Sequence, residues 1–205
     1  MGQHGRCPGS ARAGRMMIDR LMIDPFVERL TDPANAESAA SFPRDHAATE
    51  CPGLYSWWAD DEVLEMLQSV LGARMPALIY AGQAGATSTR SRRTRSATLR
   101  SRISANHLNG NVGSSTFRKS ITAVLLEPLA LRLSGPDRLD RTSNETVTAW
   151  MRAHLRIVTA PYHDRDRLAE VEHAVLERID PPLNLMGMPS TPIRTTLRDL
   201  RSRLG

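Results

Sequence analysis

The chain contains 205 residues, of which 40% are hydrophobic, and carries a formal net charge of +5. This apolar content is enough to build the core of one domain, which excludes a wholly disordered chain. The sequence contains no stretch of about 18 or more apolar residues, so we expect no membrane-spanning helix.

Cysteine content and charge indicate the cellular setting and the kind of partner. Cys7 and Cys51 are the only cysteines and neither belongs to a CxxC pair, so neither a disulfide framework nor a structural zinc site is predicted. A reducing cytoplasm is therefore the expected location. Arginine supplies nearly all of the positive charge, since Lys119 is the only lysine. A phosphate backbone requires such a charge of its partner, although an arginine bias can also reflect a GC-rich genome.

The N-terminal segment differs in composition from the rest of the chain. Residues 1–48 are poor in aromatic side chains and are interrupted by Gly, Pro and Asp, so we expect a flexible tail with one helix near Met17–Leu30. Gly53–Asp60 (GLYSWWAD) is short and aromatic, which predicts a strand followed by a helix N-cap. Apolar residues then recur at helical spacing up to Leu71. The ALIYAGQAG sequence after Pro76 predicts a second strand that runs into a glycine-containing turn.

The second half of the chain predicts helices and loops around one more strand. Thr87–Ser96 (TSTRSRRTRS) has no apolar periodicity and predicts a loop, whereas Ser96–Leu108 predicts a capped helix. The later elements are a helix from SSTFRKSITAVLLEPLAL, polar turns at 134–143, a helix from NETVTAWMRAH, a strand from LRIVTAPY, a helix from DRDRLAEVEHAVLERI stopped by Pro181-Pro182, and an amphipathic helix near the C-terminus. This order predicts a mixed α/β (α+β) domain over residues 49–189, with a C-terminal helix in 190–205 packed on it.

Two charged side chains fall within apolar helix faces. In one helix Glu172 lies one turn from both Leu168 and Leu176, and in another Arg102 lies beside Ile103 on the apolar side. A buried charge is costly unless an opposite charge or several hydrogen-bond partners compensate it. Each residue is therefore either part of a functional site or a member of a structural ion pair.

Three further side chains also allow two interpretations. Tyr55 and Tyr80 each lie in a predicted strand, where a tyrosine usually serves packing with its hydroxyl at the rim. His107 continues an apolar line on its helix, and a lone histidine in that position is usually structural. None of the three assigns a function by itself.

Considered together, these residues resemble the GIY-YIG nuclease family. Gly53-Leu54-Tyr55 resembles its GIY tripeptide, and Tyr80-Ala81-Gly82 resembles its YIG tripeptide. Arg102 stands where the family carries its helix arginine. The sequence EHAVLERIDPPLN then resembles the family's closing pattern, with a metal-binding glutamate at Glu172 and an asparagine at Asn184.

The match covers about Gly53–Leu185 and implies a small three-stranded, mainly antiparallel sheet flanked by helices. Leu54 and Ala81 replace the isoleucines of the two tripeptides, and the spacer between the two tyrosines is longer than in the bare motif. Family members with a histidine after the helix arginine tend to place it four residues on, where this chain has Asn106, whereas His107 lies five residues on. The sequence resembles the restriction-type branch more than the repair or homing branches.

The resemblance also implies a chemistry and a set of site residues. The expected reaction is hydrolysis of a DNA phosphodiester bond with one divalent metal ion, Mg²⁺ or Mn²⁺, bound by Glu172. Arg102 would grip the phosphate, and Tyr55 would help to take a proton from the attacking water. For this, either the metal or Arg102 would lower the pKa of Tyr55, or Tyr55 would relay its proton to His107. Tyr80 would position the water or the phosphate. The implied catalytic set is Tyr55, Tyr80, Arg102, His107, Glu172 and Asn184, the last as a hydrogen-bonding support.

Basic residues outside the motif predict contacts with the DNA backbone. They lie in the loop after the second strand and in the Ser114–Lys119 segment, and the alternative is that each charge run is simply solvated. The residues are Arg90, Arg92, Arg93, Arg95, Arg118 and Lys119.

The resemblance therefore implies a restriction-like endonuclease that acts on duplex DNA. A homodimer would let one site per subunit cut both strands. The alternatives are a structure-specific repair nuclease and a catalytically silent DNA-binding module with the same fold.

Overall fold

The computed structural model describes residues 21–87 and 97–205. Its central element is an antiparallel four-stranded sheet with the strand order β1-β6-β2-β3. The strands are β1 (Glu37–Ser38), β2 (Gly53–Ala59), β3 (Leu78–Ala84) and β6 (Leu155–Pro161). The last three are the strands predicted from the sequence, and the mixed α/β class is confirmed. The short strand β1 was not predicted.

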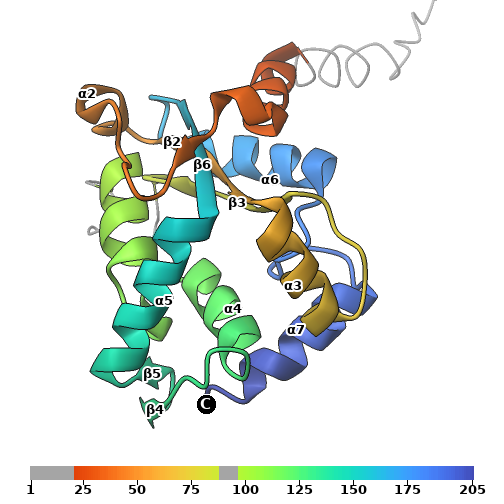
Figure 1. Cartoon of the computed structure of the whole chain (residues 1–205). Helices are drawn as coiled ribbons and strands as arrows, with labels where there is room; N and C mark the ends of the chain where they lie inside the picture. Colours follow the sequence, from red (N-terminus) through yellow and green to blue (C-terminus); the bar gives the residue numbers. More distant parts are fainter. Residues whose placement is uncertain (1–20, 88–96) are drawn as a thin grey trace, which may run out of the picture.

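Helices cover both faces of this sheet (Figure 1). On one side lies α6 (Leu168–Ile179), and on the other lie α3 (Asp61–Leu71), α4 (Thr116–Leu125), α5 (Arg141–His154) and α7 (Pro192–Ser202). The smaller elements are η1 (Pro33–Asn35), α2 (His46–Thr49), the π-helix η3 (Ser101–Leu108), η4 (Val112–Ser114) and the hairpin of β4 (Leu133–Gly135) and β5 (Arg138–Leu139).

The central strand β2 is buried on both faces, which explains its continuous apolar sequence. Side chains alternate along a strand. Tyr55 and Trp57 therefore enter the core beneath α3, α4 and α5, while Leu54 enters a second core beneath α6. A strand covered on both sides has no solvent-facing polar positions.

Local signals in the sequence fix where the helices begin and end. The Asp60 carboxylate caps α3 by accepting a hydrogen bond from the Val63 N–H at 3.0 Å, as predicted for an N-cap at this position. Helix α6 ends at Asp180, which takes a left-handed conformation with φ 48°, immediately before Pro181. Helix α7 packs on the domain through Leu197 and Leu200, and Leu204, just after the helix, joins the same core. Within the described residues, no helix is both long and apolar enough to cross a membrane.

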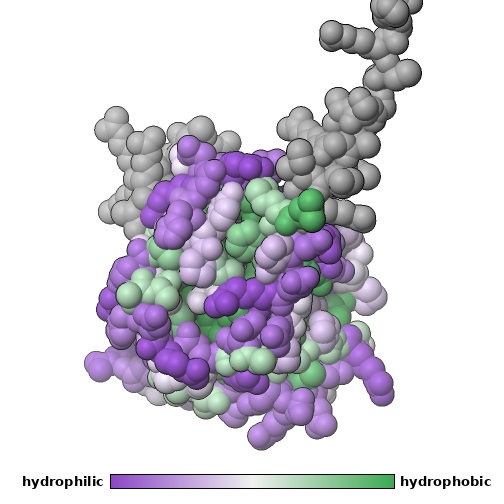
Figure 2. Space-filling view, turned by 90° about the horizontal axis from the view of Figure 1, so that it is seen from above, coloured by the Kyte–Doolittle hydropathy of each residue, from purple (hydrophilic) through white to green (hydrophobic). Residues whose placement is uncertain are grey.

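The N-terminal segment is more ordered than its composition suggests. Residues 21–31 are helical, and the prediction of a flexible tail is wrong for residues 21–48, while residues 1–20 lie outside the described part. Ile23 and Leu30 pack into the core beneath α6, and the Ser56 hydroxyl donates to the Leu30 carbonyl at 2.8 Å. The outer face above this core is mainly hydrophilic, with apolar residues in smaller patches (Figure 2).

We predict that Leu30→Ala destabilises the protein by about 3 kcal/mol, because the side chain is 0% exposed and its removal leaves a cavity. Leu21→Ala, on the same helix with 71% exposure, is the matched control and should change stability by less than about 0.5 kcal/mol. Urea unfolding followed by circular dichroism measures both. Equal effects of the two substitutions would show that this helix does not pack on the sheet.

Candidate active site

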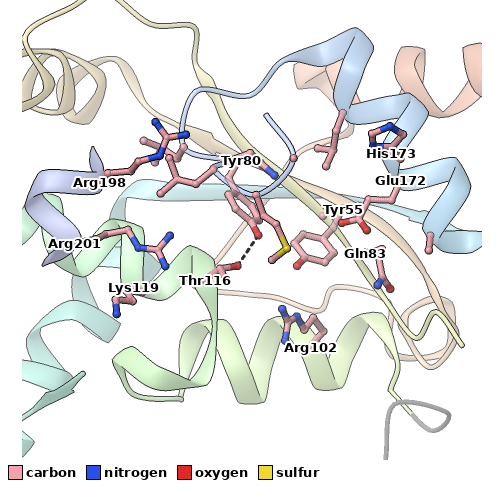
Figure 3. Close-up of a pocket in the computed structure, with 18 of the residues that line it drawn as sticks. Tyr55, Tyr80, Gln83, Arg102, Thr116, Lys119, Glu172, His173, Arg198 and Arg201 are labelled. Atoms are coloured by element: carbon pink, nitrogen blue, oxygen red, sulfur yellow. Dashed lines mark hydrogen bonds between the residues drawn. The ribbon is translucent and has the colours of Figure 1, made fainter. Parts of the chain in front are cut away.

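A cavity of about 900 Å³ lies beside strand β3, where the helices from the two faces of the sheet meet. Its walls come from β2, β3, η3, α4, α6, α7 and the loop before α7. The close-up in Figure 3 shows the polar side chains pointing into it from several of these elements. Five of the six residues predicted to be catalytic line this cavity: Tyr55, Tyr80, Arg102, Glu172 and Asn184.

The sixth, His107, lies directly behind Tyr55. Its Nε2 atom is 2.7 Å from the Tyr55 hydroxyl and its Nδ1 atom is 2.8 Å from the Ser115 hydroxyl. The imidazole is fully buried. Burial, followed by the positive charges of Arg102 and Arg118, holds its pKa well below the ordinary value of 6.5. The ring is therefore neutral at pH 7, and one of its nitrogens is a hydrogen-bond acceptor.

The π-helical form of η3 explains the five-residue spacing between Arg102 and His107. The Asn109 N–H donates to the Ser104 carbonyl at 2.9 Å, which is the five-residue hydrogen bond of a π-helix. The wider turn brings residues five apart to the same side. His107 forms a hydrogen bond with the Tyr55 hydroxyl, and the positive charge of Arg102 lowers the pKa of the same phenol. Asn106, the alternative at four-residue spacing, instead directs its amide to the Ser114 carbonyl at 3.4 Å.

The two tyrosines hold their protons strongly. Burial is the largest cause that raises the pKa of Tyr55, and Tyr80 raises it further, while Arg102 lowers it. Burial also raises the pKa of Tyr80, whose hydroxyl lies 3.1 Å from the hydroxyl of Thr116. Both phenols are therefore neutral at pH 7, and either would be a strong base if it lost its proton to a neighbour.

Glu172 on α6 is the carboxylate of this cavity. Burial raises its pKa to about 7, although Arg102 and the Gln83 N–H act in the opposite direction. Within the described residues Glu172 forms no ion pair, which removes the interpretation of a structural salt bridge there. Nor do those residues contain a group of three or more His, Cys, Asp or Glu side chains arranged to hold a metal. Among the described residues that line the cavity, Glu172 is the only acidic side chain.

The backbone of β3 brings these side chains together, and two residues hold it in place. Gly82 pairs with Tyr55 across the sheet, and a Cβ atom on Gly82 would lie 2.8 Å from the Tyr55 hydroxyl oxygen. A glycine is therefore required beside this phenol. The Asn184 amide forms two hydrogen bonds with Ala81, accepting from its N–H at 3.0 Å and donating to its carbonyl at 2.8 Å. Asn184 thus holds strand β3 in place at Ala81, next to Tyr80.

Comparison with known families decides which family the chain belongs to. A family described as the GIY-YIG catalytic domain matches residues 53–203. The chain belongs to the GIY-YIG family. It is accordingly an endonuclease with DNA as its substrate. Comparisons with the curated proteins and with the solved structures gave no match.

One residue predicted to bind DNA in this GIY-YIG domain belongs instead to the core. Arg118 on α4 is 0% exposed, so the prediction that it contacts DNA is wrong. Its guanidinium donates to the carbonyls of His107 at 2.9 Å and Leu108 at 2.8 Å, and to the Asn144 side chain at 2.8 Å. Burial lowers the pKa of Arg118 to about 10. The residue satisfies carbonyl groups at the end of η3, which a helix leaves without partners.

The other predicted DNA contacts have different outcomes. Lys119 lines the cavity and forms an ion pair with Asp137. The four loop arginines lie outside the described residues: Arg90, Arg92, Arg93 and Arg95.

Two basic residues of the cavity were missed from the sequence. Arg198 and Arg201 enter it from α7, which lies after Leu185, where the resemblance noted in the sequence ends, but within the family match over residues 53–203. With Arg194 they follow an i, i+4, i+7 spacing, which places all three on one helix face. That spacing was a usable signal, because it separates these arginines from the apolar face of the same helix.

We predict that Gly82→Ala lowers the DNA cleavage rate of this GIY-YIG endonuclease by roughly a hundredfold, because a displacement of the Tyr55 hydroxyl by about 1 Å misaligns the reacting groups. Gly135→Ala is the matched control, since a Cβ atom there meets nothing within 4 Å. Plasmid nicking rates at equal folded concentration measure the effect. An unchanged rate for Gly82→Ala would mean that the position of the Tyr55 hydroxyl does not matter for cleavage.

Proposed function

We propose that this endonuclease cuts duplex DNA in a reaction that depends on one divalent metal ion, Mg²⁺ or Mn²⁺, with Glu172 as its ligand from the chain. The observation that carries the proposal is a single carboxylate with a raised pKa in the same cavity as two phenols and a guanidinium. Perturbed ionisable groups gathered in one cavity are typical of catalytic sites.

The residues present fit such an ion. Mg²⁺ prefers oxygen ligands and keeps most of its water, so one or two carboxylates are enough to hold it. Glu172 is largely buried, and an ion beside it would provide the positive charge that a buried carboxylate requires. When bound, the ion would stabilise the negative charge that develops on the phosphate oxygens.

Other side chains of the site would contact the phosphate and transfer the proton of the attacking water. Arg102 lies beside the Tyr55 hydroxyl and would contact the scissile phosphate through its guanidinium. The Tyr55 hydroxyl would accept a proton from the attacking water while its own proton passes to Nε2 of His107, 2.7 Å away. In that arrangement Nδ1 of His107 donates to the Ser115 hydroxyl, 2.8 Å away. The neutral state of His107 supports this direction of transfer.

The proposal also covers the type of DNA that is cut and the oligomeric state of the enzyme. We infer that the chain acts as a restriction-like enzyme and that a homodimer presents one site to each strand. Supporting this is the fact that one cavity holds one set of the predicted catalytic residues, enough for one strand. The resemblance to the restriction-type branch points in the same direction.

We predict that Glu172→Ala lowers the Mg²⁺-dependent cleavage rate by at least about a hundredfold, equivalent to roughly 3 kcal/mol of lost transition-state stabilisation. Glu170→Ala, an exposed carboxylate on the same helix, is the control and should keep full activity. The assay is cleavage of supercoiled plasmid with and without EDTA. Discrete fragments would support restriction-like action, and cutting confined to branched DNA would contradict it. Cleavage in the presence of EDTA would overturn the metal requirement.

A second prediction concerns pH and stability in the absence of metal. The folded-state pKa of Glu172 is about 7 against an ordinary value of 4.5, so the folded protein retains this proton more strongly than the unfolded chain does. Its contribution to stability is complete below pH 4.5 and is lost as the pH rises through 7. The free energy of unfolding of Glu172→Gln, relative to that of the wild type, should therefore increase by on the order of 2 kcal/mol from pH 5 to pH 8.

Urea unfolding in EDTA at both pH values measures this difference. Using the difference between the two proteins cancels the titration of all other groups. Saturating Mg²⁺ at pH 8 should stabilise the wild type and not the variant, because only the ionised carboxylate binds the ion. A pH-independent difference would show that Glu172 is ionised throughout this range.

A further inference from the structure

Basic side chains form a separate group at the opposite end of the cavity from Glu172. Figure 3 shows Arg198, Arg201 and Lys119 on one side of Tyr80, and Glu172 on the other. The three cations come from two helices that are far apart in sequence, α4 and α7. We call these three residues the α7 cluster.

Two members of the α7 cluster have no carboxylate partner. Within residues 21–87 and 97–205, no ion pair involves Arg198 or Arg201. Arg198 has a weak hydrogen bond to the Ser190 hydroxyl at 3.4 Å, and Arg201 is half-buried, with burial lowering its pKa. The Asp137 carboxylate, which pairs with Lys119, is within electrostatic reach of Arg201 and acts against the lowering of its pKa. Among the described residues, the three cations of the cluster therefore share this one carboxylate, which leaves positive charge for an anionic ligand to balance.

Buried hydrogen bonds of a neighbouring arginine fix the position of the α7 cluster. Arg194, one turn before Arg198, is 1% exposed and donates to the Asn184 carbonyl at 2.8 Å, to the Pro181 carbonyl at 3.0 Å and to the Asp180 carboxylate at 2.6 Å. These bonds join α7 to the loop that follows α6. Because Arg194, Arg198 and Arg201 share one helix face, fixing the first directs the other two toward the cavity.

The Tyr80 hydroxyl lies between the two positive regions. Arg102 and Arg201 both lower its pKa, so the phenol is within electrostatic reach of each guanidinium. The cavity of about 900 Å³ is far larger than one phosphate group. Two anionic groups can therefore occupy it together, one on each side of this phenol.

We propose that Lys119, Arg198 and Arg201 bind a second phosphate of the DNA strand being cut, next to the scissile phosphate and separated from it by Tyr80. The inference rests on the proposed function, since it places the scissile phosphate beside Glu172 and Arg102. An arginine fork matches phosphate oxygens in a bidentate manner, and consecutive phosphates are the repeating anion of a DNA strand. The α7 cluster thereby sets the direction in which the strand crosses the cavity.

The first test measures DNA binding without cleavage. A fluorescein-labelled 20-base-pair duplex is titrated in EDTA at several NaCl concentrations, using wild type and the R198Q/R201Q double variant. Loss of one phosphate contact should weaken binding roughly tenfold and reduce the slope of log affinity against log salt by about 1. R198K/R201K keeps the charge and should keep the slope. An unchanged slope for R198Q/R201Q would overturn the proposal.

The control must lose the same charge elsewhere on the surface. R141Q/R178Q removes two exposed arginines, which pair with Glu145 and Asp24 outside the cavity. This pair should leave the slope within about 0.3 of wild type, and a decrease equal to that of R198Q/R201Q would show a general charge effect, which also overturns the proposal. Near-ultraviolet circular dichroism confirms that all variants are folded.

The second test locates the phosphate relative to the cleavage position. Each phosphate neighbouring the mapped cut is replaced in turn by an uncharged methylphosphonate. One replacement should slow wild-type cleavage by roughly tenfold or more and should have no further effect on R198Q/R201Q, because the partner is already absent. Equal effects on both proteins at every position would overturn the proposal. Failure of wild type to cut any DNA would instead contradict the proposed function, and the salt slope would still decide whether the α7 cluster binds phosphate.

Discussion

A buried hydrogen bond between Tyr55 and His107 joins the sheet to the helices that surround the cavity. The two atoms are 2.7 Å apart, and both side chains are excluded from solvent. A buried polar group that loses its partner costs far more than the net contribution of the bond when it is made. Strand β2 and the π-helix η3 therefore cannot shift relative to each other without a large loss of free energy. The site geometry is a consequence of this constraint.

The same bond extends into α4 through one hydroxyl. Ser115 contacts Nδ1 of His107 and also accepts the Arg118 N–H at 2.9 Å, which makes it the N-cap of α4. Arg118 returns from the first turn of α4 to the carbonyls at the end of η3. The orientation of the imidazole and the start of the helix are thus one hydrogen-bonded network. Within the described residues, the buried Nε atom of Arg118 is the one side-chain nitrogen of this network that has no hydrogen-bond partner.

The sequence predicted features that depend on local chemistry or on the motif. The strands around Tyr55 and Tyr80, the N-cap at Asp60 and the end of α6 before Pro181 each have a local signal, and the structure confirms them. The π-helix has no such signal, because its wider turn is selected by the tertiary contacts of its side chains. A five-residue spacing that looked like a departure from the family is the spacing this helix requires.

Burial of charged residues was the least predictable property. Arg118 and Lys119 are neighbours in a basic segment, yet one is in the core and the other lines the cavity. Sequence composition cannot separate them, because the carbonyls that accept from Arg118 come from η3 and α5, distant in the chain. The packing of the N-terminal helix was missed for a similar reason, since Leu30 is stabilised by contacts with strands that come much later in the chain.

The distribution of charge in the cavity bears on the proposal that Glu172 alone among the carboxylates holds the metal ion. A phosphodiester approaching Glu172 alone would meet a like charge, and burial already raises the pKa of this group to about 7. Arg102 offsets part of that charge on one side of Tyr80, and Arg201 faces the same phenol from the other side. A further carboxylate in the lining would reduce this positive potential, on which the proposed phosphate binding depends. The surplus of cations around a single acid in the lining therefore fits the proposal that the cavity holds a phosphate beside Glu172.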